Sequence, residues 1–97
     1  MKAVFIHFDQ AHKDDVIRIL DKYMVHGFTL WDNTQGRGTR NGEPHYGSHA
    51  WPSLNNSIMT VVENDMVSKL KTALKELDEI SPMLGLRVFV LNVEDVY

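Results

Sequence analysis

The sequence predicts a ferredoxin-like α+β sandwich, in which four strands and two helices follow the order βαββαβ. Four short segments are rich in β-branched and aromatic residues, as strands are, and two longer segments repeat apolar residues at helical spacing. A long polar stretch separates the two βαβ halves. The length of 97 residues suits one domain, so we expect a single domain spanning residues 1–97.

The first half of the chain has the pattern strand, helix, strand. Residues 2–8 are mostly apolar and favour a buried strand. Residues 13–25 carry an apolar stripe on one helix face, and Gly27 is a suitable stop after them. Residues 28–31 then begin a second strand. The stripe of the expected helix consists of Val16, Ile17, Leu20 and Met24.

The second half repeats this pattern. Residues 58–63 predict the third strand, and Asn64 is a good N-cap for a helix that continues to about Glu79. Pro82 and Gly85 mark a turn, and residues 86–93 predict the fourth strand. The apolar stripe of this second helix consists of Met66, Val67, Leu70, Leu74 and Leu77.

The first and fourth strands are apolar on both of their faces. Two helices can cover only one face of a four-stranded sheet, and an antiparallel sheet with one wet face should alternate apolar with polar residues. The apolar residues on the other face would form an exposed patch of the kind that marks an interface. We therefore expect a homo-oligomer. The residues that lead to this expectation are Ala3, Val4, Phe5, Ile6 and Phe8, with Val88, Phe89, Val90 and Leu91.

Composition excludes several classes of protein. The formal net charge of −3 and the pI near 5.9 argue against a general nucleic-acid binder. The absence of cysteine excludes disulfides, thiolate nucleophiles and thiolate-bound metal. No apolar run suits a signal peptide or a membrane span, so we expect a cytoplasmic protein without membrane insertion.

The stretch between Trp31 and Ile58 is the most unusual part of the chain. Its 26 residues include four glycines and two prolines, and it is flanked by apolar, regular segments. Connections this long are uncommon in compact domains and are usually either functional or disordered. A disordered linker would be poor in aromatic residues, whereas this one holds Tyr46 and Trp51. We interpret it as a binding loop.

Two groups of residues in this loop could bind a ligand. Residues 35–40 combine glycines, whose amides can form an anion nest, with two arginines that supply charge-assisted donors. His45 and His49 lie four residues apart and could bind zinc, copper or nickel, although loop histidines are often only polar surface. A catalytic arrangement is poorly supported, because nothing resembles a nucleophile elbow with a positioned base.

Three segments resemble the PII-like superfamily, the nitrogen regulatory proteins of signal transduction. Residues 27–30 read Gly-Phe-Thr-Leu, where the family typically has Gly-Met-Thr-Val. Residues 36–38 match the Gly-x-Gly that begins the family's long T-loop. Residues 89–96 read Phe-Val-Leu-Asn-Val-Glu-Asp-Val, close to the family's Phe-Val-x-Pro-Val-Glu-Asp-Val. The element order matches along nearly the whole chain.

The resemblance implies a homotrimer with inward-facing sheets and T-loops that project outward, here from about residue 35 to 56. It also implies an adenine nucleotide in clefts between subunits and a T-loop that regulates a transporter or an enzyme. The ligand-binding residues would be Thr29, Gln35, Gly36, Arg37, Gly38, Thr39 and Arg87. The candidate residues for contact with the partner protein are Arg40, Tyr46 and Trp51, since exposed aromatic residues dominate interaction hot spots. Alternatively, Trp51 folds back and packs against the base of the loop.

The chain also departs from typical members. The turn at residues 81–85 lacks the family's lysine, no lysine follows the loop, and the family's Arg-x-Arg after the fourth strand has no counterpart. A triphosphate needs several donors or cations, and fewer are present here. Our leading interpretation is a non-catalytic PII-like sensor. The alternative is a metal-binding PII-like or CutA-like trimer that uses His45 and His49 to hold a divalent ion.

Overall fold

The computed structural model describes residues 1–37, 40, 44–47 and 54–97. Its elements follow the predicted order, with short 3₁₀ turns before the first helix and after the second. The ferredoxin-like fold is therefore confirmed. The strands and helices are β1 (Lys2–Asp9), α1 (Lys13–Lys22), β2 (Thr29–Thr34), β3 (Asn55–Val62), α2 (Asn64–Ile80) and β4 (Arg87–Asn92).

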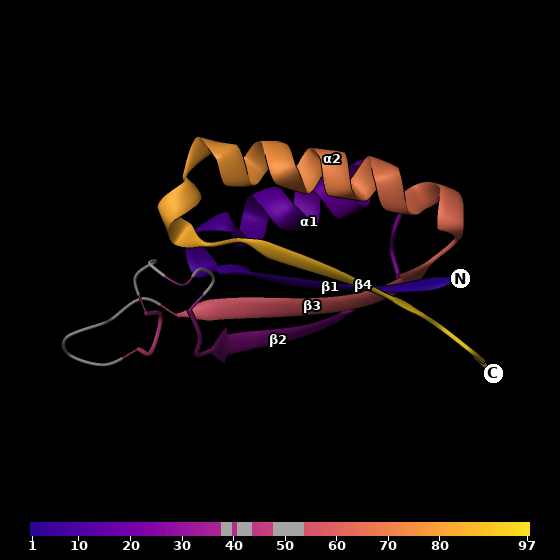
Figure 1. The fold of residues 1–97 in the computed structure, drawn as a ribbon, viewed down its shortest axis with the longest axis horizontal. Helices are drawn as coiled ribbons and strands as arrows, with labels where there is room; N and C mark the ends of the chain where they lie inside the picture. Colours follow the sequence, from indigo (N-terminus) through magenta and orange to yellow (C-terminus); the bar gives the residue numbers. More distant parts are fainter. Residues whose placement is uncertain (38–39, 41–43, 48–53) are drawn as a thin grey trace.

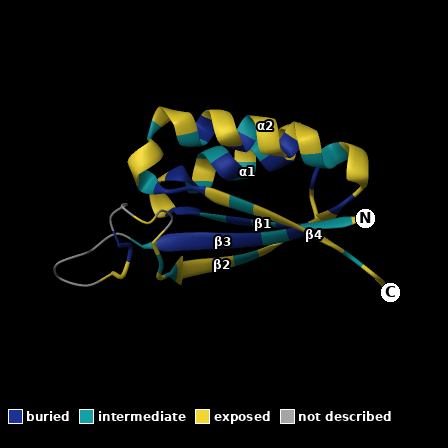
Figure 2. Ribbon diagram, in the orientation of Figure 1, coloured by how far each residue is buried: buried dark blue, intermediate teal, exposed yellow. Residues whose placement is uncertain are grey.

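The four strands form one antiparallel sheet in the order β2-β3-β1-β4. Both helices lie against the same face of this sheet, and the long connection between β2 and β3 leaves at the end opposite the two termini (Figure 1). The core fills the layer between helices and sheet, so the buried residues of each helix lie on its sheet-facing side (Figure 2). The core consists of Val4, Ile6, Phe8, Val16, Leu20, Val25, Ile58, Val62, Leu70, Leu74, Leu77 and Leu86.

Helix α1 ends earlier than the sequence predicts. It stops at Lys22, and Met24 adopts a left-handed conformation with φ of 59°. The amide of Met24 donates to the carbonyl of Asp21 at 3.0 Å, and the amide of Val25 donates to that of Leu20 at 2.8 Å. These two bonds form a Schellman motif, which normally places glycine where Met24 lies. The prediction that Met24 belongs to the apolar stripe was wrong, since its side chain is 76% exposed.

Strands β2 and β3 are longer than predicted, and β2 contains a bulge. Trp31 pairs with Ser57 and Thr34 pairs with Asn55, so three steps along β2 match two steps along β3. The extra residue is accommodated at Asn33, whose φ is 59°. Because side chains alternate along a strand, the extra residue turns Thr34 to the same face of the sheet as Trp31. The connection between the strands is correspondingly shorter than the predicted 26 residues.

The second helix matches its prediction closely. It covers Asn64–Ile80, but Glu63 is the N-cap and Asn64 is already the first helical residue. The predicted N-cap was thus wrong by one position. A 3₁₀ turn then leads to Gly85, whose φ of 78° suits glycine and brings the chain into β4.

The face of the sheet opposite the helices is open in the single chain. On it Phe89 and Leu91 of β4 are 54% and 51% exposed, and Trp31 of β2 is also exposed. The exposed side chains of Phe89 and Leu91 agree with the prediction that the fourth strand is apolar on both faces. None of the helices in the described ranges combines the length and apolar character needed to cross a membrane.

Candidate functional site

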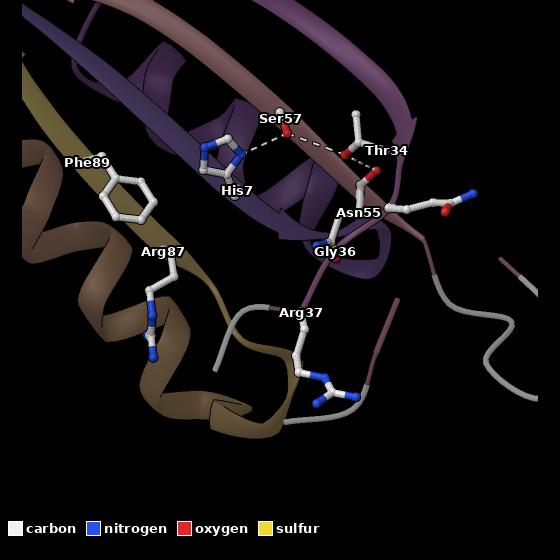
Figure 3. Close-up of a pocket in the computed structure, with 9 residues that line it drawn as sticks. His7, Thr34, Gly36, Arg37, Asn55, Ser57, Arg87 and Phe89 are labelled. Atoms are coloured by element: carbon white, nitrogen blue, oxygen red, sulfur yellow. Dashed lines mark hydrogen bonds between the residues drawn. The ribbon is translucent and has the colours of Figure 1, made fainter. Parts of the chain in front are cut away.

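A cavity of about 440 Å³ lies on the open face of the sheet, where the long connection begins. It gathers the last residues of β1 and β2 and the first residues of β3 and β4, which meet at this end of an antiparallel sheet. Figure 3 shows the lining side chains in relation to these strands. The cavity is lined by His7, Thr34, Gln35, Gly36, Arg37, Asn55, Ser57, Arg87 and Phe89.

A chain of hydrogen bonds forms the polar floor of this cavity. The hydroxyl of Thr34 donates to the backbone carbonyl of Asn55 at 2.9 Å and lies 3.3 Å from the Ser57 hydroxyl. The Ser57 Oγ lies 2.9 Å from the His7 Nδ1 (Figure 3). Since Thr34 has already used its one proton, Ser57 donates to Thr34 and His7 Nδ1–H donates to Ser57. The network therefore fixes the tautomer of neutral His7.

His7 is held among aromatic rings as well as by this network. Its ring stacks on Phe5, with centroids 6.3 Å apart and planes 15° apart, and lies 5.8 Å from the ring of Phe89. Partial burial lowers the pKa of His7 below its usual 6.5, because the imidazolium form would lose hydration. At neutral pH the ring is therefore uncharged.

Two arginines supply the positive charge of the cavity. Arg37 comes from the long connection and Arg87 from the start of β4, so they approach from separate elements (Figure 3). Both residues are exposed, and the guanidinium of Arg87 donates to the backbone carbonyl of Leu86 at 3.1 Å. Guanidinium groups that are exposed at a cavity can bind the oxygens of a carboxylate or phosphate in pairs. The arrangement therefore suits an anionic ligand.

The structure brings together several of the residues that the sequence singled out for ligand binding. Gln35, Gly36, Arg37 and Arg87 line the cavity. Thr29 does not, because it lies at the start of β2 and faces Met59 at the far end of the strand. Gly38 and Thr39 lie outside the described residues.

The candidate partner-binding and metal-binding residues are only partly described. Arg40 and Tyr46 are both exposed. Trp51 and His49 lie outside the described residues, so the His45–His49 pair stays a prediction. Among the described residues, no group of three or more histidine, aspartate or glutamate side chains is placed to hold a metal ion.

His45 differs most from its expected surroundings. The sequence suggested a surface residue or metal ligand, but His45 is only 1% exposed. Its Nδ1 is hydrogen-bonded to Asn55 Oδ1 and lies 3.5 Å from Asp9 Oδ2. The backbone of His45 also forms a two-way bridge with Gly36, with N···O distances of 3.0 and 2.6 Å.

Five of the residues that line the cavity were not predicted from the sequence as ligand-binding residues. His7 could have been indicated by its position as a polar residue between Ile6 and Phe8, since its face of the sheet was already expected to be an interface. Thr34 could not be placed without the bulge at Asn33, and the long loop was expected to include positions 55 and 57. The missed residues are His7, Thr34, Asn55, Ser57 and Phe89.

Fold and site together define a small α+β protein with an anion-compatible cavity at the base of a long inter-strand loop. The sequence matches the family described as Nitrogen regulatory protein P-II over residues 1–97. The chain therefore belongs to the P-II family, which confirms the resemblance seen in its motifs. No curated protein sequence matches the chain.

Solved structures of PII-like proteins share the fold. The protein CPII from Thiomonas intermedia K12, bound to ADP and bicarbonate, aligns with a TM-score of 0.75 and 25% identity over 95% of this chain and 84% of its own. The same protein bound to ADP, AMP and bicarbonate aligns with a TM-score of 0.74 and 23% identity, and the match covers 95% of this chain and 88% of that chain. A PII-like signalling protein from Thermus thermophilus aligns with a TM-score of 0.67 and 23% identity, and the match covers 95% of this chain and 85% of that chain.

Proposed function

We propose that this protein is a non-catalytic PII-like sensor that binds an adenine nucleotide in the cavity at the base of its long loop. The observation that carries the proposal is the joint lining of this cavity by Arg37 and Arg87. It is supported by membership of the P-II family and by the ADP held by the similar CPII protein.

The cavity has the character that a nucleotide requires. Ligand pockets commonly measure roughly 300–1,000 Å³ and combine apolar walls with a few polar groups, and this cavity measures about 440 Å³. Phe89 offers an apolar surface, while the hydroxyls of Thr34 and Ser57 offer hydrogen bonds. Two guanidinium groups suit a monophosphate or diphosphate better than a triphosphate, since each added phosphate group needs further donors.

We further propose that three copies assemble through their open sheet faces and complete the site. A patch that contains Phe89, Leu91 and Trp31 favours burial against another subunit. Thr29 lies at the opposite end of β2 from the cavity. In a cleft between subunits, Thr29 would therefore come from the neighbouring copy and lie near the base of the nucleotide.

The long loop would transmit the signal. A bound anion would contact Gly36 and Arg37, at the point where the loop begins, and so favour one loop conformation. A transition of such a segment between disordered and ordered states is an established kind of switch. The exposed Arg40 and Tyr46, together with Trp51, would then contact a regulated transporter or enzyme in the cytoplasm.

A thermal-shift panel with ADP, AMP, ATP, zinc, copper and nickel tests this proposal. A ligand at about 100 times its Kd stabilises the native state by roughly 2.7 kcal/mol, which in a domain of this size raises Tm by on the order of 10 °C. We expect ADP or AMP to raise Tm more than ATP does. If no nucleotide changes Tm and a metal does, the metal-binding alternative replaces the nucleotide proposal.

A further inference from the structure

A buried polar cluster joins the long loop to the cavity floor. It consists of Asp9, His45 and Asn55, which are 4%, 1% and 7% exposed, and we call it the anchor. The anchor draws on three separate segments, because Asp9 ends β1, Asn55 begins β3 and His45 lies in the loop between β2 and β3. A histidine with this degree of burial needs specific partners to offset its lost hydration.

The hydrogen bonds of the anchor define which atom of His45 is the donor. Its Nδ1 faces two acceptors, Asn55 Oδ1 and Asp9 Oδ2, so this nitrogen carries the proton. The other carboxylate oxygen of Asp9 accepts from the backbone amide of Ala11 at 2.8 Å. Asp9 Oδ2 makes no hydrogen bond among the described residues, and the nearby imidazole is the polar group that faces it.

The anchor also holds the loop residues that line the cavity. The backbone of His45 pairs with that of Gly36, and Gly36 directly precedes Arg37 at the cavity. Gly36 packs so closely on Asn55 that a Cβ at this position would lie 3.2 Å from the Asn55 amide nitrogen. Asn55 in turn accepts the Thr34 bond of the cavity floor through its backbone carbonyl. Fixing His45 therefore fixes both Gly36 and the position from which Arg37 extends.

We infer that His45 is a positioning residue, which binds Asn55 through its Nδ1–H and thereby preorganises Gly36 and Arg37 for an anionic ligand. A preformed site loses less conformational entropy when the ligand binds, and this favours a higher affinity. The inference concerns the ligand site of the proposed function and extends it to a residue that does not line the cavity.

Two substitutions of His45 separate the hydrogen bond from the volume of the side chain. In His45→Asn the amide N–H can occupy the place of Nδ1, whereas in His45→Gln the amide extends to the place of Nε2 and leaves no donor opposite Asn55. Both replacements are neutral and polar. His45→Asn is therefore the matched control for His45→Gln.

The first measurement is hydrogen exchange of the backbone amides without any ligand. We expect the Gly36 and His45 amides to exchange about tenfold faster or more in His45→Gln, because a lost buried hydrogen bond weakens the bridge. In His45→Asn the same two amides should exchange at close to the wild-type rate. The exchange rates of the Ile6 and Ile58 amides in the central strands should be unchanged in both variants. A general loss of stability would instead accelerate exchange at these two amides as well.

The second measurement is the affinity for ADP by calorimetry. We expect about tenfold weaker binding in His45→Gln and near-normal binding in His45→Asn. If the wild-type protein does not bind ADP, the proposed function fails, but the exchange measurement still decides the role of His45. If His45→Gln does not fold, Asn55→Ala removes the acceptor from the same bond and should give the same faster exchange.

Three results would overturn the inference. The Gly36 and His45 amides could exchange in His45→Gln as slowly as in the wild type. The Asn and Gln variants could accelerate exchange equally, so that the position of the donor would not matter. Finally, ZnCl₂ could raise the Tm of the wild type but of neither variant, which would make His45 a metal ligand.

Discussion

At the scale of single residues, the protonation of His7 links the cavity to pH. Burial lowers the pKa of His7 in the folded chain, so the unfolded chain binds more protons between that value and about 6.5. Stability therefore falls as the pH drops through 6.5 and stops falling below the folded-state pKa. We expect His7→Asn to lose less stability between pH 7 and pH 5 than the wild type in urea unfolding at fixed protein concentration. The same change at the exposed His26 is the control, and parallel curves for wild type and His7→Asn would contradict the expectation.

The two cavity arginines should act differently from arginines elsewhere on the surface. A lost charge-assisted hydrogen bond commonly costs about 1.5–3 kcal/mol, so we expect Arg87→Ala to weaken ADP binding by roughly 10- to 100-fold. Arg87→Lys should recover only part of this loss, because an ammonium group cannot form the paired bonds of a guanidinium. Arg18→Ala is the control, since Arg18 pairs with Asp15 on the outer side of α1. Calorimetry that gives Arg87→Ala the wild-type affinity would remove Arg87 from the ligand site.

At the scale of elements, the sequence predicts type and order well and element ends poorly. The apolar stripes of both helices and the compositions of the strands were sufficient for the architecture, because burial against one sheet face imposes that pattern. The end of α1 depends instead on Met24 adopting a left-handed conformation, and no composition rule favours methionine there.

The residues of the cavity could be predicted only in part, because some of them are placed by local backbone features that composition does not reveal. Arg37 and Gly36 lie in a recognisable glycine-containing segment, so sequence motifs indicated them. Thr34 enters the cavity because of the bulge at Asn33, and a local insertion of this kind is a property of strand pairing that the sequence of one strand does not reveal. His45 was expected at the surface because one of its buried partners, Asp9, is distant in sequence.

The strained end of α1 offers a direct test at this scale. A non-glycine residue in the left-handed region costs on the order of 1 kcal/mol, and the exposed side chain of Met24 contributes little packing in return. We expect Met24→Gly to raise the free energy of unfolding by about 0.5–1 kcal/mol. Met24→Ala keeps the strain and should change little. Denaturant unfolding compares the three proteins, and a destabilised Met24→Gly would mean that the methionine makes a stabilising contact in the assembled protein.

At the scale of the whole molecule, the open sheet face connects the fold to the proposed site. The helices cover one face of the sheet (Figure 1). The cavity is lined by residues at one end of the other face. In the proposed assembly, residues on this face would serve both subunit contacts and ligand binding, because a subunit packed there would also approach the cavity. Thr29, which is remote from the cavity within one chain, would be brought to a second copy's cavity only by such packing.

Assembly through the open face can be tested by measuring the mass of the ligand-free protein in solution. Phe89 is 54% exposed in the single chain and lies at the centre of the fourth strand, so Phe89→Asp would place a charge in the proposed interface. We expect light scattering at micromolar concentration to give three times the mass of one chain for the wild type and a smaller species for Phe89→Asp. Ile80→Asp is the matched control, because Ile80 is 75% exposed at the end of α2 and outside the open face. A wild-type monomer would contradict the proposed assembly, and a trimeric Phe89→Asp would move the interface to another surface.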